Sequence, residues 1–252
     1  MGWKFINKPA TETEPEDIEL QIEGDIIDDE DVWIYEWFGI KATSPNAFKN
    51  ELSKYAGKHI TVRINSYGGS VWAAAGMYNA LEDHKAKGGT IDTRTDQKAM
   101  SAATIPYMAG QKRMQGAVDM LMIHNPLTEV YGYASDLRKV ADVLDEVKET
   151  IINAYQLGTG RSRNKISQLM DAETYMGAKK AIEEGFTTEM ITGAAPEEPG
   201  ISNLIYDRGK IMNSSGDALK RMVALCKEQS PPKPPGNTAI LKARLALECE
   251  IF

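Results

Sequence analysis

The chain has few of the residues from which disulfide frameworks and metal sites are built. Of its 252 residues only Cys226 and Cys249 are cysteines, and no cysteine pair has the CxxC spacing of a metal motif. Two cysteines cannot form a disulfide framework in a chain of this length, so a reducing cytoplasm is the expected location. The sequence predicts no metal site.

Long apolar runs and positive charge are also lacking. No stretch approaches the roughly 18 apolar residues of a membrane span, and the first 20 residues do not resemble a signal peptide. The formal net charge of −7 argues against a nucleic-acid-binding surface. We therefore expect neither a membrane nor a nucleic-acid partner, and the composition fits a soluble enzyme or an assembly subunit.

Strand, turn and helix patterns alternate over residues 18–193. They predict strands at Ile18–Ile26, Ile60–Ile64, Ile91–Arg94 and Val118–Ile123, and helices at Ala47–Tyr55, Val71–His84, Ala99–Ala109, Ala134–Leu157, Arg163–Met170 and Ala178–Glu184. Ser44 and Pro45 are typical of a helix start, and Gly158 and Gly185 of helix ends. Strand–turn–helix units in series predict an α/β fold with mostly parallel strands.

The two ends of the chain differ in character from this central part. Residues 1–17 are polar and acidic and predict a flexible N-terminal arm. Residues 194–252 contain two proline-rich linkers and two helix candidates, at Asp217–Lys227 and Thr238–Glu250, and predict a C-terminal extension.

Only three histidines are present, so each is a distinct candidate for acid–base chemistry. His59 reads as a solvated loop residue, and His84 as a helix-end residue favourable to the helix dipole. His124 ends an apolar strand and precedes Asn125-Pro126, which would place it at the sheet edge where α/β enzymes hold their substrates.

Ser101 opens a segment of small residues, where its hydroxyl would lie beside unpaired backbone N–H groups. Taken by itself, the residue is more simply interpreted as a helix-capping serine. The Gly68-Gly69 turn, also between a strand and a helix, offers a second set of N–H groups. The order of glycine pair, serine, histidine and acid differs from that of α/β-hydrolases, chymotrypsin and subtilisin.

Four segments resemble the proteolytic subunit of the Clp protease. Residues 64–71 (INSYGGSV) are similar to its INSPGG-x-V turn, residues 99–103 (AMSAA) to its serine segment and residues 122–127 (MIHNPL) to its MIHQPL segment. Residues 175–186 are similar to its F-M-S-A region, and the resemblance covers about residues 18–193. It implies a ClpP/crotonase-type α/β spiral of strand–turn–helix units.

The resemblance also implies the roles of individual residues. It makes Ser101 the nucleophile and His124 the base, and it places the oxyanion donors on the N–H groups of Gly69 and Ala102. Gly68 and Ser70 would belong to the turn that meets the substrate strand. Glu173 takes the place of the family aspartate as third catalytic residue, with Asp171 in reserve. This chemistry needs no cofactor.

Some positions depart from the family pattern. Tyr67 replaces a proline, and Gln97 stands where the serine motif usually has glycine. The ends of the chain, the EGDI strand and the E-T-Y-M segment resemble the ClpP-like head maturation proteases of phages and prophages. This resemblance implies the host cytoplasm as the location if a phage encodes the protein. The N-terminal arm lacks an identifiable loop for an unfoldase, so an unfoldase partner is not expected.

The sequence therefore predicts a serine endopeptidase, ATP-independent or partner-assisted, that acts on proteins or peptides, with capsid or scaffold proteins as its substrates. By resemblance, the helix Ala134–Leu157 is the handle helix of a ring homo-oligomer, heptameric or of stacked heptamers. Two alternatives remain open: a catalytically weakened ClpP-like shell or scaffold subunit, and a crotonase-type acyl-CoA enzyme.

Overall fold

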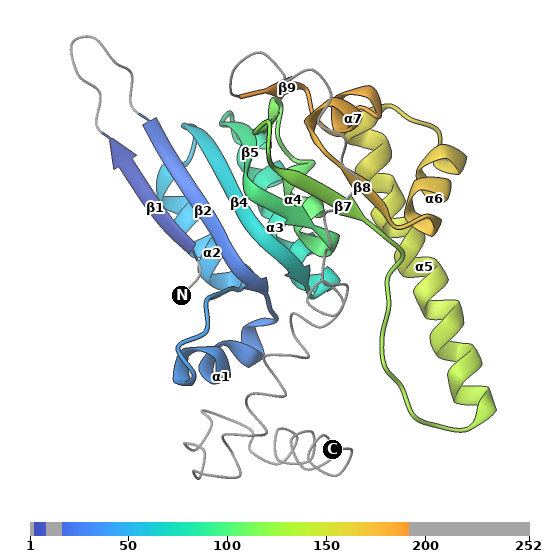
Figure 1. Cartoon of the computed structure of the whole chain (residues 1–252). Helices are drawn as coiled ribbons and strands as arrows, with labels where there is room; N and C mark the ends of the chain where they lie inside the picture. The colour runs from blue at the N-terminus through green and yellow to red at the C-terminus, as the bar shows by residue number, and fades with distance from the viewer. Residues whose placement is uncertain (1–2, 9–16, 192–252) are drawn as a thin grey trace.

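A mixed sheet runs through the part of the chain that the structure, a computed structural model, describes: residues 3–8 and 17–191 (Figure 1). Its main path is β1-β2-β4-β5-β6-β9, with β3 beside β2, β7 beside β5 and β8 beside β7. The strands are β1 (Trp3–Lys8), β2 (Asp17–Ile26), β3 (Ala42–Thr43), β4 (His59–Gly69), β5 (Thr90–Met100), β6 (Arg113–Gln115), β7 (Met120–Ile123), β8 (Thr174–Met176) and β9 (Glu189–Met190). Only the β1–β2 and β7–β8 pairs are antiparallel, so the expected α/β fold with mostly parallel strands is confirmed.

Helices connect the parallel strands. The α-helices are α1 (Val32–Trp37), α2 (Pro45–Leu52), α3 (Val71–Ala86), α4 (Thr104–Tyr107), α5 (Ala134–Thr159), α6 (Arg163–Asp171) and α7 (Ala178–Glu183). Short 3-10 turns precede α1, follow α2, and join β5 to α4 at Ser101–Ala103. The helix candidates at 217–227 and 238–250 lie outside the described residues.

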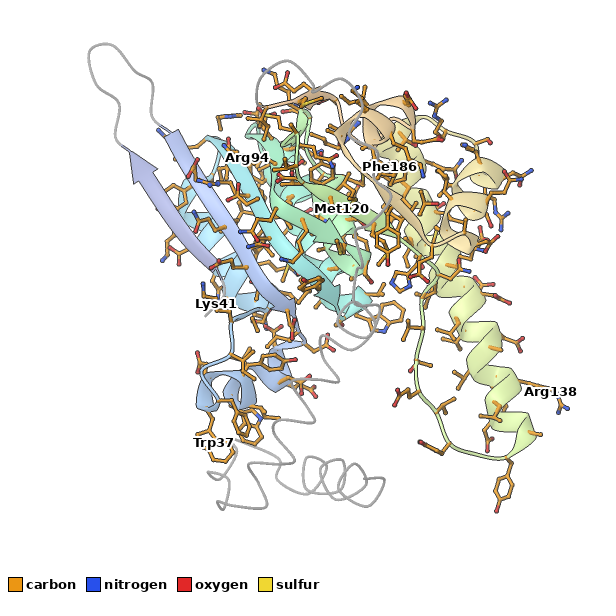
Figure 2. The ribbon with its side chains drawn as sticks, viewed as in Figure 1. Trp37, Lys41, Arg94, Met120, Arg138 and Phe186 are labelled. Atoms are coloured by element: carbon orange, nitrogen blue, oxygen red, sulfur yellow. The ribbon has the colours of Figure 1, made fainter. Side chains whose placement is uncertain are left out.

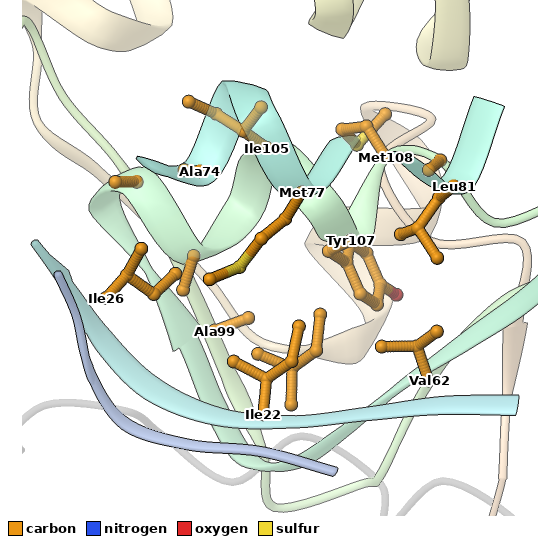
Figure 3. Close-up of a cluster of buried hydrophobic side chains, with 14 of the residues drawn as sticks. Ile22, Ile26, Val62, Ala74, Met77, Leu81, Ala99, Ile105, Tyr107 and Met108 are labelled. Atoms are coloured by element: carbon orange, nitrogen blue, oxygen red, sulfur yellow. The ribbon is translucent and has the colours of Figure 1, made fainter. Parts of the chain in front are cut away.

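One face of the sheet forms the main core. Alternate residues of β2, β4 and β5 point to this face, where α3 and α4 cover them (Figure 3). Figure 3 shows Met77 of α3 and Tyr107 of α4 above Ile22 and Val62, all buried. Because the period of two puts every second residue under the helices, this face explains the alternating pattern in the sequence.

The opposite face of β2, β4 and β5 is charged. Arg63 of β4 bonds to Glu19 of β2 at 2.9 Å and to Asp96 of β5 at 2.7 Å. Arg94 projects from the same face (Figure 2). These strands are therefore amphipathic, unlike the strand β7, whose four residues are all buried.

The strand β7 is buried on both sides. Leu121 and Ile123 belong to the main core, whereas Met120 and Met122 belong to a second apolar cluster with Met100. Tyr67 and Tyr175 pack against this methionine cluster. Burial on both faces explains why the sequence shows a continuous apolar run here.

The helix α5 has two halves with different surroundings. Its buried residues all lie between Val147 and Tyr155, in the C-terminal half. The N-terminal half projects away from the sheet, with the connection from β7 running beside it (Figure 1; Arg138 is labelled in Figure 2). Tyr133 and Leu137 at this end are exposed. The helix ends at Gly160, with a φ of 68°, rather than at the expected Gly158.

Several expectations about elements require correction. Ala99 and Met100, expected in a helix, belong to β5, because they pair with Leu121 and Met122 of β7. Residues 3–8, expected within a flexible arm, form β1 on the edge of β2. Ser44 does not cap α2 with its side chain; Asp29 instead accepts a hydrogen bond from the N–H of Asn46. The sequence reading also missed α1 and the short strands β3, β6, β8 and β9.

Candidate active site

Ser101 lies on a sharp turn at the carboxyl end of β5. Met100 is still extended, whereas Ser101 has a φ of 52°, in the left-handed region that side-chain-bearing residues rarely adopt. The chain then enters the 3-10 turn and α4. A serine on such a turn is lifted from the strand, so its hydroxyl can face a neighbouring strand end.

His124 follows β7 directly and meets Ser101 across the sheet edge. The strands β5 and β7 are parallel, with Met100 opposite Met122, so their carboxyl ends lie side by side. His124 Nε2 is 2.7 Å from Ser101 Oγ. Since a hydroxyl donates to a neutral imidazole nitrogen, this geometry suits removal of the serine proton. The structure thus brings the two predicted residues into direct contact.

The other two histidines lie away from this pair. His84 is buried, with Nε2 2.9 Å from the carbonyl oxygen of Lys58. His59 is exposed at the start of β4, and its Nδ1 is 2.8 Å from Thr90 Oγ1. Each of these two histidines has a structural hydrogen-bond contact, and neither lies beside Ser101.

The Gly68-Gly69 pair ends β4 and packs against the turn at Ser101–Ala103, here called the serine turn. The φ angles are 109° and 140°, which only glycine adopts readily. A Cβ on Gly68 would lie 2.8 Å from the carbonyl oxygen of Met100 and from Ser101 Cβ, and 3.0 Å from the nitrogen of Ala102. A Cβ on Gly69 would lie 2.1 Å from the carbonyl oxygen of Ile26. The pair is therefore wedged between β2 and the serine turn, beside the predicted oxyanion donor Ala102.

Ser66 and Ser70 fix the two ends of this glycine pair. Ser66 Oγ accepts a hydrogen bond from the N–H of Gly68 at 3.0 Å. Ser70 caps α3 by accepting from the N–H of Ala73 at 3.2 Å, and its hydroxyl donates to Asp28 Oδ1 at 2.9 Å. The turn is thus anchored to α3 and to the loop after β2.

Glu173 lies next to His124 by the register of β7 and β8. These strands are antiparallel with Ile123 opposite Thr174, so the next positions outward are His124 and Glu173. Glu173 is half-buried, has a φ of 48°, and its Oε1 accepts from the hydroxyl of Tyr175 at 3.1 Å. The positive φ lies in the turn between α6 and β8, directly before the chain enters β8.

Asp171, the reserve candidate, is engaged elsewhere. Its exposed carboxylate accepts hydrogen bonds from Lys148 Nζ at 2.6 Å and Asn125 Nδ2 at 2.9 Å. The hydrogen bonds from Lys148 and then Asn125 hold the pKa of Asp171 below its usual value. Asp171, at the end of α6, therefore connects α5 with Asn125, the residue after His124. It supports the site from outside, and its hydrogen bonds do not go to the imidazole.

A cavity of about 540 Å³ opens beside Gly69 and Ser70. Its walls are mixed: they include the apolar side chains of Trp72, Leu127 and Val143 (from α5) and the carboxyl groups of Asp28 and Asp31. Asp28 and the other residues from the loop after β2 were missed by sequence reasoning. No motif marks that loop, and only its contact with Ser70 reveals its place at the site.

Gln97 sits in a bulge of β5 and is exposed. The register with β4 shifts between Ile64 and Ser66, and Gln97 has a φ of 81°. The bulge explains why glycine would suit this position. The side chain lines a second cavity of about 550 Å³, on the charged face of the sheet with Arg63 and Arg94.

Within residues 3–8 and 17–191, no helix combines the length and apolar character of a membrane span. The same residues contain no cluster of three or more His, Cys, Asp or Glu side chains suited to holding a metal ion.

The fold and the site together define the class: an α/β protein with a serine–histidine pair and a glycine turn at the carboxyl ends of parallel strands. The sequence profile of the family described as Clp protease matches residues 51–194, more than half of the chain. The chain therefore belongs to the Clp protease family.

Curated relatives agree with this assignment. The chain is 31% identical over 137 residues to the ATP-dependent Clp protease proteolytic subunit of Bacteroides fragilis, covering 54% of this chain and 65% of that protein. The subunit of Porphyromonas gingivalis is also 31% identical over 137 residues, at 54% and 60% coverage. Subunit 2 of Thermobifida fusca is 31% identical over 139 residues, at 54% and 66% coverage. The chain thus spans somewhat less than two thirds of the length of these relatives.

Proposed function

We propose that this chain is a serine endopeptidase in which Ser101 attacks the peptide carbonyl and His124 acts as general base and acid. The observation that carries the proposal is the 2.7 Å contact between Ser101 Oγ and His124 Nε2. Family membership supports it, because the relatives are named as proteolytic subunits. Neither a metal nor a cofactor enters this chemistry.

The reaction follows from the arrangement of the pair. His124 Nε2 takes the hydroxyl proton as Ser101 Oγ bonds to the substrate carbonyl carbon, giving a tetrahedral oxyanion. Collapse breaks the C–N bond, and the imidazolium gives its proton to the leaving amine. A water molecule then attacks the acyl-serine by the same route in reverse, which releases the acid product.

The N–H groups of Gly69 and Ala102 are proposed to hold the oxyanion. The close approach of Gly68 to Ser101 and to the Ala102 nitrogen supports this role, because the glycine turn lies against the peptide group that carries one of the two donors. Backbone donors fixed before the reaction stabilise developing charge without reorganisation. The cavity beside Gly69 is the proposed place for substrate side chains.

Glu173 is the proposed third residue. The β7–β8 register places it opposite His124, and the hydrogen bond from Tyr175 fixes one of its oxygens. A carboxylate there would keep the imidazole in the tautomer with an unprotonated Nε2.

Assembly into a homo-oligomeric ring, heptameric or stacked, is part of the proposal. Its structural support is the projecting N-terminal end of α5, where the large apolar side chains of Tyr133 and Leu137 are exposed. Exposed apolar side chains on a projecting helix are expected to be covered by another copy of the chain.

The biological role proposed is head maturation in a phage or prophage, by cleavage of capsid or scaffold proteins. It rests on the resemblance of the EGDI strand and the E-T-Y-M segment to that group of proteases. The role predicts cleavage of a co-expressed capsid protein without an added unfoldase. Intact capsid protein beside a peptide-cleaving chain would contradict the role and leave the peptidase proposal in place.

The test of the peptidase proposal compares the wild type with Ser101→Ala in peptide hydrolysis and fluorophosphonate labelling. We expect labelling of Ser101 and a fall in rate of about 10³-fold or more in the variant. Circular dichroism and size-exclusion profiles should not change. A folded wild type that neither labels nor cleaves would instead support the shell or scaffold alternative, and acyl-CoA turnover would support the crotonase alternative.

A further inference from the structure

A buried hydrogen-bond chain links α5 to the serine turn. Tyr155 of α5 is 2% exposed, and its hydroxyl is 2.6 Å from Thr104 Oγ1. Thr104 is fully buried, and its Oγ1 is also 2.6 Å from the carbonyl oxygen of Ser101. Two side chains far apart in sequence therefore converge on the backbone of the proposed nucleophile.

The two hydrogen bonds that link Tyr155, Thr104 and Ser101 can run in only one direction. A carbonyl oxygen only accepts, so the Thr104 hydroxyl donates its single proton to Ser101. The contact between the two hydroxyls must then be made by the Tyr155 proton, which donates to Thr104 Oγ1. Burial raises the pKa of Tyr155, so the phenol stays protonated and remains a donor.

The bonded oxygen belongs to the peptide unit that carries the proposed oxyanion donor. The Ser101 carbonyl and the Ala102 N–H are opposite ends of one planar group, so fixing the oxygen fixes the direction of the N–H. The N–H of Thr104 also reaches the Ser101 carbonyl. Hydrogen bonds accepted at the oxygen polarise the peptide and strengthen its N–H as a donor.

We propose that Thr104 and Tyr155 are positioning residues for the oxyanion hole, which they hold through the Ser101–Ala102 peptide. The inference rests on the proposed peptidase function. Neither side chain needs to touch the substrate, because both act from the core side of the turn. Ser101 has a φ of 52°, and such a conformation persists only where its surroundings fix it.

The test uses Tyr155→Phe and Thr104→Val, which remove one hydroxyl each and keep the shape of the side chain. We expect kcat for a peptide substrate to fall about 10-fold to 100-fold, with KM within twofold, because the loss is in transition-state stabilisation. The pH dependence of kcat/KM should keep its midpoint, since His124 is untouched. Thr104→Ser retains the hydroxyl and should restore most of the rate.

Tyr107→Phe is the matched control. The Tyr107 hydroxyl is also buried and lies 3.0 Å from Thr187 Oγ1 and 3.3 Å from the Met114 carbonyl oxygen, away from the serine turn. This variant loses a buried hydrogen bond of the same type, so its Tm should fall about as much as that of Tyr155→Phe. Its kcat should remain within twofold of the wild type.

Three results would overturn the inference while leaving the peptidase proposal intact. They are an unchanged kcat in Tyr155→Phe, an equal fall in kcat in Tyr107→Phe, and a Thr104→Ser variant as slow as Thr104→Val. A wild type without any hydrolysis would instead overturn the peptidase proposal, and this inference with it. If Tyr155→Phe does not fold, the comparison of Thr104→Ser with Thr104→Val decides.

Discussion

Among the described residues, three other than glycine have positive φ angles: Gln97 at 81°, Ser101 at 52° and Glu173 at 48°. Each such position costs on the order of 1–3 kcal/mol of stability and persists only where its surroundings enforce it. Two of the three are proposed catalytic residues, and the third lies four positions before the serine. Backbone strain is thus concentrated where the chemistry is proposed.

Gln97 allows this strain to be measured apart from the chemistry. Gln97→Gly should raise the stability by about 0.5–1 kcal/mol, because relief of the positive φ exceeds the added freedom of glycine in the unfolded chain. This corresponds to a Tm higher by about 1–4 °C in calorimetry. Gln97→Ala, which keeps the strained backbone, is the control. A Tm that falls with glycine and not with alanine would contradict the explanation.

Glu173→Gln and Asp171→Asn separate the two acid candidates. Because Glu173 lies opposite His124 by register, its amide variant should lower kcat by about 10²-fold to 10⁴-fold in peptide hydrolysis. Asp171→Asn loses an ion pair with Lys148 in which the Asp171 carboxylate is exposed, and kcat should change by less than about tenfold. The reverse order of the two variants would transfer the role to Asp171.

At the scale of elements, the site depends on how closely the end of β4 approaches the end of β5. Gly68→Ala would place a methyl group 2.8 Å from Ser101 Cβ, so the turn must move or the variant must unfold in part. We expect fluorophosphonate labelling to fall more than tenfold. The matched control is Gly57→Ala, at a φ of 76° with open space around it, which should lose only about 1 kcal/mol of stability and keep its labelling. Equal labelling in both variants would show that the close approach is not required.

The strands also show where sequence reasoning succeeds and fails. Alternation identified β2 and β4, and the apolar run identified β7, because one or both faces of these strands are buried. The second half of β5 was missed, since the polar run Asp96-Gln97-Lys98 resembles a loop and only pairing with β7 holds it extended. Strands of two or three residues, such as β8, carry too few side chains to show a period. The contact of Ser101 with His124 was predictable from motifs, whereas the Thr104–Tyr155 chain required the packed core.

At the scale of the whole molecule, the projecting N-terminal half of α5 is expected to decide whether the protein is a monomer or an oligomer. Leu137→Asp places a charge on the projecting half and should reduce the assembly toward the 27.8 kDa monomer in light scattering. Leu157→Asp, which changes an exposed residue at the other end of the same helix, should leave the assembly intact. A wild type that is monomeric at all concentrations would contradict the ring proposal.

The left-handed backbone conformation of Ser101 also has a consequence for how the sequence evolves. A chain that serves only as a shell has no use for a hydroxyl on a strained turn, and substitutions that relax Ser101 would be favoured once hydrolysis is no longer selected. Ser101→Gly should accordingly melt above Ser101→Ala, although neither can cleave. The positive φ at Ser101 therefore lowers the folding stability of every copy of the protein, and selection is expected to retain it only while hydrolysis is needed.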